Sequence, residues 1–543
     1  MNEDVNGSSF TSRNGRAFKP GDRCLIVGMY NDHTRVTSPV ERDIDNYRGT
    51  TIHEIFHNLD LGHSYHCGDE CAGVDLNQLA ECNNPPTGCS PNINDNNNVC
   101  NLQNSSSNNL MSAGPTLTAL TPCQLEVLHR TLQAFPPYVK RPSCDLTESD
   151  IIIYGGQDIV WNGKRFLSSG ITIKPGAKLT IKCQVGFPEL GRITVEQGGI
   201  LVVDGGTLTS NCDRAWDGVE VLGTPNASQY TPGAQGRVEL RNGATIEYAQ
   251  IGVSLHRRNP TTLGGGILIA NNANFINNAR AISFYDYENF LPGIPDFELG
   301  NASFIFNCNF TVNDDFPAES FLGQTFSEHI SLFNVKFVTI NSSFFEDKRT
   351  TDITNPFGYP SGFGISASSS DFSVLGCTFE NLVYGVEASN FSSIVQFRVL
   401  ESTFDGNYTG IHTRGVNNFR VEENTFKVGG FDRQVSGIDD ISRQTGLFID
   451  HGTGFRVEEN SFEDNGGGSQ NIGICAKNTN LDIFTDEILD DYNDIYKNTF
   501  DALSFGDLAN GNNQAFPLGL TYLCNGNTSN GKDFTVVDGA IAS

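Results

Sequence analysis

The chain has 543 residues, which is enough for two or more domains with hydrophobic cores of their own. Its formal net charge of −28 disfavours a nucleic-acid partner, because such partners require a basic surface. The sequence has no apolar run of about 18 residues that could span a membrane. Its first ten residues lack the basic start and apolar run of a signal peptide, so a secreted protein would need an export signal absent from this sequence.

Three histidines at relative positions 0, +4 and +10 form the most informative motif: His53, His57 and His63. Residues four apart share one helix face, so His53 and His57 can bind the same metal while Glu54 stays beside it. The spacing predicts a zinc site with three His ligands, in which Glu54 takes a proton from water as the general base. The alternative is an ordinary amphipathic helix with surface or core histidines. His66 is the spare ligand if His63 is not one.

A second stretch extends this pattern. Met111 is one of three methionines, and a helix is predicted over residues 120–132, with Thr121 as N-cap and Pro122 at the first helical position. Together with the histidine motif, these residues resemble the metzincin zinc metallopeptidases, most closely the pappalysin-type branch. The resemblance implies an α+β zincin-like region at 1–140, protein or peptide substrates, and Met111 in a turn that supports the metal.

The part of the chain before the motif is short for such a domain. Only 52 residues precede His53, whereas the resemblance implies several strands there. Residues 22–29 predict one strand, and residues 1–20 are polar and rich in Gly and Ser. The metallopeptidase region is therefore expected to lack N-terminal strands.

Cysteine usage indicates an oxidising compartment. Eight of the 14 cysteines lie in the first 150 residues, around loops too polar to build a core: Cys24, Cys67, Cys71, Cys82, Cys89, Cys100, Cys123 and Cys144. We expect a disulfide framework there, of a connectivity that the sequence does not determine. A structural zinc site that includes Cys67 and Cys71 is the alternative. Within the same region, residues 92–109 predict an exposed loop in which Asp95 is a candidate Ca²⁺ ligand, with a solvated loop as the simpler interpretation.

The composition changes after a set of prolines at 136, 137 and 142. We expect a linker at 141–150 and an all-β region at 151–543, because short apolar alternations separated by Gly and Asn replace every helical periodicity. The strands predicted in its first part lie within residues 171–181, 193–203, 218–221, 238–246, 252–255 and 266–269.

A phenylalanine repeat indicates how these strands are arranged. The aligned positions are Phe344, Phe379, Phe404, Phe426, Phe462 and Phe500. Most are followed by a Gly-apolar strand, which begins at Gly385, Gly410, Gly446, Gly473 and Gly519. Coils of about 22 residues predict a right-handed parallel β-helix with Phe in the core and Asn hydrogen-bonded up the stack at the corners. The region resembles the pectin-lyase-like β-helices of bacterial secreted and surface proteins.

The β-helix region shows no repeated arrangement of acidic residues. The candidates Asp213, Asp217, Glu220, Asp439 and Asp440 are interpreted as solvated corners, and a hidden lyase or hydrolase site is the alternative. Three histidines of this region occur singly and are expected to be surface or satisfied polar groups: His256, His412 and His451.

These observations predict a secreted or cell-surface zinc metalloendopeptidase that is carried on a β-helix stalk. Zn²⁺ is the expected cofactor. The rival prediction is an adhesive or carbohydrate-binding β-helix, with extracellular glycans as partners and an inactive peptidase remnant. A polysaccharide lyase or hydrolase is a third possibility.

Overall fold

A computed structural model describes side chains from residue 144 to 537, with gaps at 213, 317–325, 351–360, 391–395, 436–442, 467–469, 486, 489–490 and 515–518. Backbone alone is described for the end of the last strand and for β1 (Gly15–Ala17) and β2 (Cys24–Ile26), which pair antiparallel. β2 lies within the strand that the sequence predicts at 22–29. Contacts divide the chain into two units, Met1–Arg141 and Pro142–Ser543, which are described separately.

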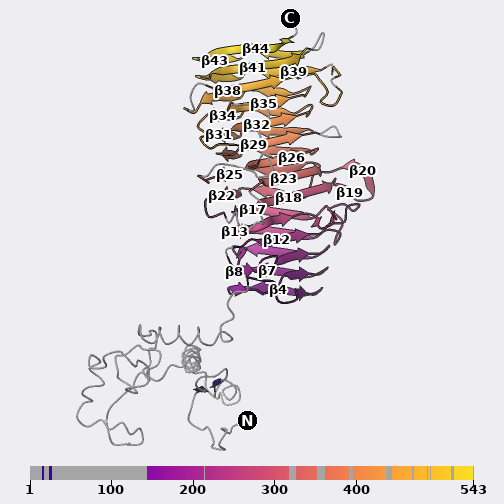
Figure 1. Ribbon diagram of the computed structural model, residues 1–543. Coiled ribbons are helices and arrows are strands. Elements are labelled where there is room, and N and C mark those ends of the chain that lie inside the picture. Colours follow the sequence, from indigo (N-terminus) through magenta and orange to yellow (C-terminus); the bar gives the residue numbers. More distant parts are fainter. Residues whose placement is uncertain are drawn as a thin grey trace, which may run out of the picture. The chain divides into compact units, whose positions relative to one another are not determined.

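The second unit is a stack of coils, each of which contributes one strand to a 14-stranded parallel sheet, here called sheet A (Figure 1). Along sheet A, every strand pairs with the equivalent strand of the coils before and after it. Its strands are β3 (Ile151–Ile153), β6 (Ile171–Ile173), β9 (Arg192–Val195), β12 (Trp216–Val221), β14 (Ala249–Ser254), β18 (Arg280–Tyr287), β23 (Glu328–Val335), β26 (Phe363–Ser368), β29 (Tyr384–Ser389), β32 (Thr409–Arg414), β35 (Thr445–Asp450), β38 (Ile472–Lys477), β41 (Phe505–Asn513) and β44 (Lys532–Ile541).

The remaining strands of each coil belong to a 24-stranded sheet that contains two parallel ladders, here called B and C. Ladder B consists of β4 (Asp158–Trp161), β7 (Lys178–Ile181), β10 (Ile200–Asp204), β13 (Arg237–Glu247), β17 (Ile267–Ile276), β21 (Phe304–Phe306), β24 (Val338–Asn341), β27 (Phe372–Leu375), β30 (Phe397–Leu400), β33 (Arg420–Glu422), β36 (Arg456–Glu458), β39 (Tyr492–Tyr496) and β42 (Gly519–Leu523). Ladder C consists of β5 (Arg165–Phe166), β8 (Gln184–Phe187), β11 (Thr207–Ser210), the second halves of β13 and β17, β22 (Asn309–Val312), β25 (Phe344–Asp347), β28 (Thr378–Glu380), β31 (Thr403–Asp405), β34 (Thr425–Val428), β37 (Ser461–Asp464), β40 (Thr499–Asp501) and β43 (Gly526–Thr528). The chain runs A, B, C in every coil, so the predicted right-handed parallel β-helix is confirmed over this unit.

A phenylalanine of ladder C fills the core of successive coils. The ring of Phe426 stacks on those of Phe404 and Phe462, with centroids 4.8 and 4.6 Å away. Space for this column comes from a glycine in each facing strand of sheet A. A methyl group at Gly410 would lie 2.9 Å from Cδ1 of Phe426 and 2.5 Å from the carbonyl oxygen of Gly446. Both distances are too short, so only glycine fits at this position. This packing explains why Phe and Gly recur together in the sequence.

The corner between ladders B and C carries the predicted asparagine ladder. Asn424, Asn460 and Asn498 are buried, and each side-chain amide donates to the next side chain up the stack. The distances from Nδ2 to Oδ1 are 2.9 Å for the first two pairs and 3.1 Å for the pair from Asn498 to Asn525. Because each amide also donates to a backbone carbonyl, the ladder satisfies polar groups that the turn would otherwise bury without partners.

Two details of the predicted repeat are wrong by a shift in register. Phe345, and not Phe344, pairs with Phe379 and stacks on it at 4.7 Å, while Phe344 takes the neighbouring position on the strand. Similarly, the glycine column of sheet A continues from Gly473 to Gly506, because Gly519 begins β42 of ladder B.

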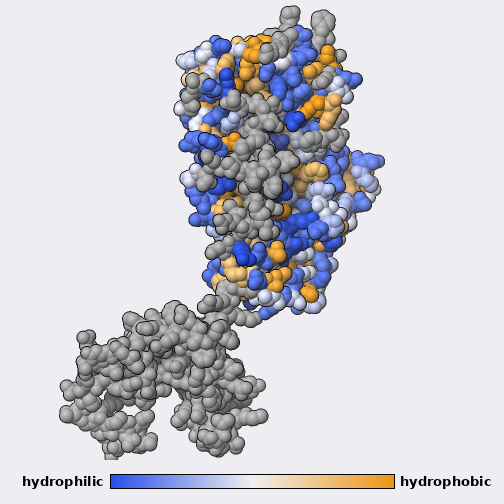
Figure 2. All heavy atoms as spheres, in the orientation of Figure 1, coloured by the Kyte–Doolittle hydropathy of each residue, from blue (hydrophilic) through white to orange (hydrophobic). Residues whose placement is uncertain are grey.

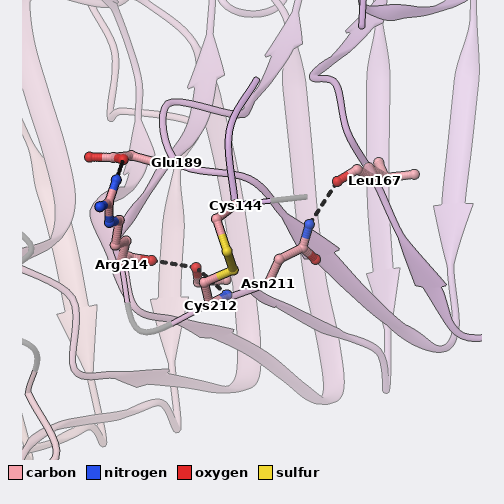
Figure 3. The surroundings of a disulfide bond; sticks show 7 residues. Cys144, Leu167, Glu189, Asn211, Cys212 and Arg214 are labelled. Atoms are coloured by element: carbon pink, nitrogen blue, oxygen red, sulfur yellow. Dashed lines mark hydrogen bonds and ion pairs between the residues drawn. A yellow bond between two sulfur atoms is a disulfide. The ribbon is translucent and has the colours of Figure 1, made fainter. Parts of the chain in front are cut away.

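One disulfide joins the segment before the first coil to the end of β11. Cys144 bonds to Cys212, which lies 68 positions later in the sequence (Figure 3). An ion pair of 2.5 Å between Arg214 and Glu189 and a hydrogen bond from Asn211 to the carbonyl oxygen of Leu167 lie beside it. The disulfide indicates an extracytoplasmic compartment. The seven other cysteines before residue 150 lie outside the part of the chain whose side chains are described.

Two hairpins project from corners between sheet A and ladder B: β15 (Arg257–Arg258) with β16 (Thr261–Thr262), and β19 (Phe290–Leu291) with β20 (Ile294–Glu298). On the face that Figure 2 shows, the described surface is mostly hydrophilic, with apolar residues in small separate patches. Within the described residues, no helix is long and apolar enough to cross a membrane.

Candidate functional site: a groove on sheet A

The outward face of sheet A changes character along the stack. At its N-terminal end lies a buried network of charges. Arg192 donates to Asp217 at 2.6 Å and to Glu220 at 3.2 Å, and Arg258 of the β15–β16 hairpin lies 2.8 Å from Asp217. Asp217 and Glu220 are only 6% and 3% exposed, so their interpretation as solvated corners is wrong. The hairpin covers these two carboxylates, and their ion pairs with arginine offset the free-energy cost of burying their charges. Such an arrangement is typical of a structural network.

The middle of the same face carries a different cluster. Oε2 of Glu387 accepts a hydrogen bond of 3.0 Å from Ser366, and burial raises the pKa of Glu387 to about 7. The imidazole of His412 stacks between the rings of Tyr384 and Phe448, with centroids 4.8 and 5.2 Å away. His412 is therefore packed between aromatic rings rather than free at the surface. The lyase or hydrolase alternative stays a prediction.

A groove of about 450 Å³ opens at the C-terminal end of this face, over β35, β38, β41 and β44. The strand register arranges its lining in three columns that run along the helix axis. The central column is Phe448, Cys475, Leu508 and Thr535; the outer columns are Ile472, Phe505 and Lys532 on one side and Lys477, Asn510 and Val537 on the other. Its size falls within the range of small-ligand sites, and its floor is apolar.

Cations surround this apolar floor. The guanidinium of Arg443 lies 4.9 Å from the centroid of the Phe505 ring, and Nζ of Lys532 lies 5.3 Å from it. Lys477 has the carboxylate of Asp450 at 4.0 Å. Among the described residues, no carboxylate forms an ion pair with Arg443 or Lys532. Within the described residues, two cations without a carboxylate partner thus lie over one aromatic ring, an arrangement suited to an anion with an apolar face.

The structure describes only some of the residues that the sequence singles out. The predicted zinc ligands His53, His57 and His63, the base Glu54 and the supporting Met111 lie outside the described residues. So do the calcium candidate Asp95 and the acidic candidates Asp213, Asp439 and Asp440. In the part that is described, no three His, Cys, Asp or Glu side chains are grouped so as to hold a metal ion.

The two remaining single histidines have polar partners, as predicted. Nε2 of His256 lies 3.2 Å from Oγ of Ser283, and Nδ1 of His451 lies 2.7 Å from the carboxylate of Asp450. Burial lowers the pKa of His256, so its ring is neutral at physiological pH.

No model of a known protein family matches the chain, and no curated protein matches its sequence. Among solved structures, the surface protein and adhesin PfbA of Streptococcus pneumoniae aligns with 77% of this chain and 95% of its own, at 10% identity and a TM-score of 0.24. The periplasmic alginate epimerase AlgG aligns with 66% of this chain and 77% of its own, at 11% identity and a TM-score of 0.21. At such values neither likeness identifies a ligand or an activity, and the β-helix assignment rests on the strand pairings of the chain itself.

Proposed function

We propose that this protein is a secreted or cell-surface binding protein whose β-helix holds an acidic polysaccharide in the groove on sheet A. The observation that carries the proposal is the pair of cations over the ring of Phe505, Arg443 and Lys532, neither of which forms an ion pair with a described carboxylate. The apolar floor suits the carbon–hydrogen face of a sugar ring, and the cations suit its carboxylate or sulfate. The columns of lining residues run along the helix axis, so a linear polymer can extend along the stack.

Loss of the two cations should weaken binding without harming the fold. We expect the double variant Arg443→Ala/Lys532→Ala to bind hexagalacturonate at least about tenfold more weakly, since each lost charged contact is worth about 1.5 kcal/mol or more. Isothermal titration calorimetry measures the change. A matched control removes two cations outside the groove, Lys178→Ala/Lys497→Ala, whose side chains are 42% and 49% exposed. Equal loss in the two double variants would reduce the effect to net charge and contradict the proposal.

The second candidate function is zinc-dependent peptide hydrolysis by the region before residue 140. The spacing of His53, His57 and His63 around Glu54 favours it. In this proposal the three histidines would hold Zn²⁺, which would supply a Lewis acid that lowers the pKa of water, and Glu54 would accept the proton. The β-helix then carries the peptidase to its substrate.

Two variants separate metal binding from catalysis in the full chain. His57→Ala should abolish the binding of about one zinc per chain, as measured by elemental analysis after washing. Glu54→Gln should keep the zinc and lower casein hydrolysis by roughly two or more orders of magnitude. Equal zinc content in the wild type and in His57→Ala would remove this candidate.

A further inference from the structure

A second groove, of about 590 Å³, lies on ladder B beside the β19–β20 hairpin, which projects from the stack in Figure 1. Its floor consists of outward residues of three adjacent strands, Thr339, Ser373 and Arg398, which the register places in one column. The chain that follows the hairpin, from Glu298 to Gly300, forms one wall. This groove is on a different sheet from the acidic-polysaccharide groove and shares no residue with it.

Phe337 lies at the edge of this groove, and both its backbone conformation and its exposure are unfavourable for the stability of the fold. It has a backbone φ of 55°, a left-handed conformation that bulky side chains disfavour. Its side chain is also 43% exposed, so the ring gains only part of the stabilisation that burial would give. Glycine or asparagine would suit the backbone better, and a polar residue would suit the exposure better. A strained, exposed aromatic residue at the mouth of a groove points to a role in binding.

Hydrogen-bond acceptors and donors both face the groove on ladder B. One carboxylate oxygen of Asp371 accepts the backbone N–H of Gln396 at 2.5 Å, and the other has no hydrogen-bond partner among the described residues. The guanidinium of Arg398 has its nearest described carboxylate, Glu422, at 3.8 Å, which leaves its other donors available. Nζ of Lys336 lies 3.0 Å from the carboxylates of both Glu288 and Glu298, so one cation is shared between two carboxylates. The groove thus presents the carboxylate of Asp371 and the guanidinium of Arg398, with hydroxyl groups between them and an excess of carboxylates beside it.

We propose that this groove binds a neutral saccharide, with the ring of Phe337 against the apolar face of one sugar and with Asp371 and Arg398 hydrogen-bonded to its hydroxyls. A sugar hydroxyl both donates and accepts, and this pair supplies one acceptor and one donor. The carboxylates beside this groove disfavour an anion, which distinguishes the ligand from the acidic polymer proposed for sheet A. The two proposals are independent, because neither groove contributes a residue to the other.

Phe337→Gly tests this proposal sharply, because a structural role and a binding role predict opposite results. Glycine relieves the left-handed strain, so the melting temperature should be unchanged or higher. Binding of neutral hexasaccharides (cellohexaose, xylohexaose and mannohexaose, each titrated calorimetrically) should fall at least about tenfold for the one that binds the wild type. Phe337→Tyr should retain binding. Phe484→Ala, a control at a 67% exposed phenylalanine outside the lining, should leave binding unchanged.

Three outcomes would overturn the proposal. The first is that none of the three sugars binds the wild type with a Kd below about 10 mM, a limit weaker than ordinary ligand affinities. The second is unchanged binding in Phe337→Gly. The third is loss of neutral-sugar binding in Arg443→Ala/Lys532→Ala, which would assign the sugar to the groove on sheet A. Failure of hexagalacturonate binding alone would leave this proposal standing and remove only the other.

Discussion

Replacing Asp507 by valine is expected to raise the free energy of unfolding by about 4 kcal/mol at pH 7. Asp507 points into the core from β41, is 0% exposed, and has no hydrogen-bond partner for either carboxylate oxygen in the described part of the chain. The register places it between Ile474 and Phe534. Burial raises the pKa of Asp507 to about 8, so the folded protein must keep the carboxyl protonated at neutral pH. Valine suits the position, since Val386 occupies the same column.

The effect of this substitution should depend on pH in a defined direction. Between the ordinary pKa of 3.8 and the folded value of about 8, the unfolded chain loses the proton while the folded chain keeps it. The folded state then binds more protons, so wild-type stability falls as the pH rises through this window. Urea unfolding should show the smallest advantage of Asp507→Val near pH 4 and the largest at about pH 8. An advantage that does not change with pH would contradict the buried-carboxyl account. Asp501→Val, at an exposed position of β40, is the control and should show no such trend.

Phe426→Ala should lower the free energy of unfolding by about 3–5 kcal/mol, because the ring is 1% exposed and stacked on both sides. Truncation leaves a cavity that the glycine column of sheet A cannot fill. In a solenoid, the loss is transmitted to neighbouring coils first, so limited proteolysis should cut between about residues 400 and 465 before other parts of the β-helix.

The matched control for that prediction is Phe484→Ala. Phe484 is 67% exposed, and its truncation should change stability by less than about 0.5 kcal/mol. Equal melting temperatures for Phe426→Ala and the wild type would mean that the phenylalanine column does not stabilise the coils.

The β-helix could be predicted from the sequence because its repeat has a steric cause. From Phe379 to Phe500, each coil has one large ring in ladder C and one glycine opposite it in sheet A, and this pair marks every turn of that part of the chain. The two register errors occurred where the phenylalanine or the glycine of the repeat could not be identified from spacing alone. Phe344 and Phe345 are adjacent, so spacing alone does not choose between them. Gly506 was missed because the inward position that follows it is Asp507, and the expected signature was glycine followed by an apolar residue.

Neither groove could be predicted, for a different reason. The lining of the groove on sheet A comes from residues between 443 and 537, which become neighbours only when the coils stack in register. Whether Arg443 and Lys532 pair with a carboxylate depends on which carboxylates the stack brings near them. The prediction that Asp217 and Glu220 are solvated was wrong for the same reason, because the hairpin that buries them is an insertion in the following coil. The aromatic and basic residue types were visible in the sequence, but their common face was not.

Hydrogen–deuterium exchange of the full chain with and without hexagalacturonate tests the central proposal most directly. We predict that the sugar slows exchange in β35, β38, β41 and β44, whose outward residues line the groove on sheet A. Exchange in ladder B around Thr339 and Ser373 should stay unchanged, because that groove is proposed to take a neutral saccharide. Protection confined to other strands, or no protection at a saturating concentration of the sugar, would contradict the account.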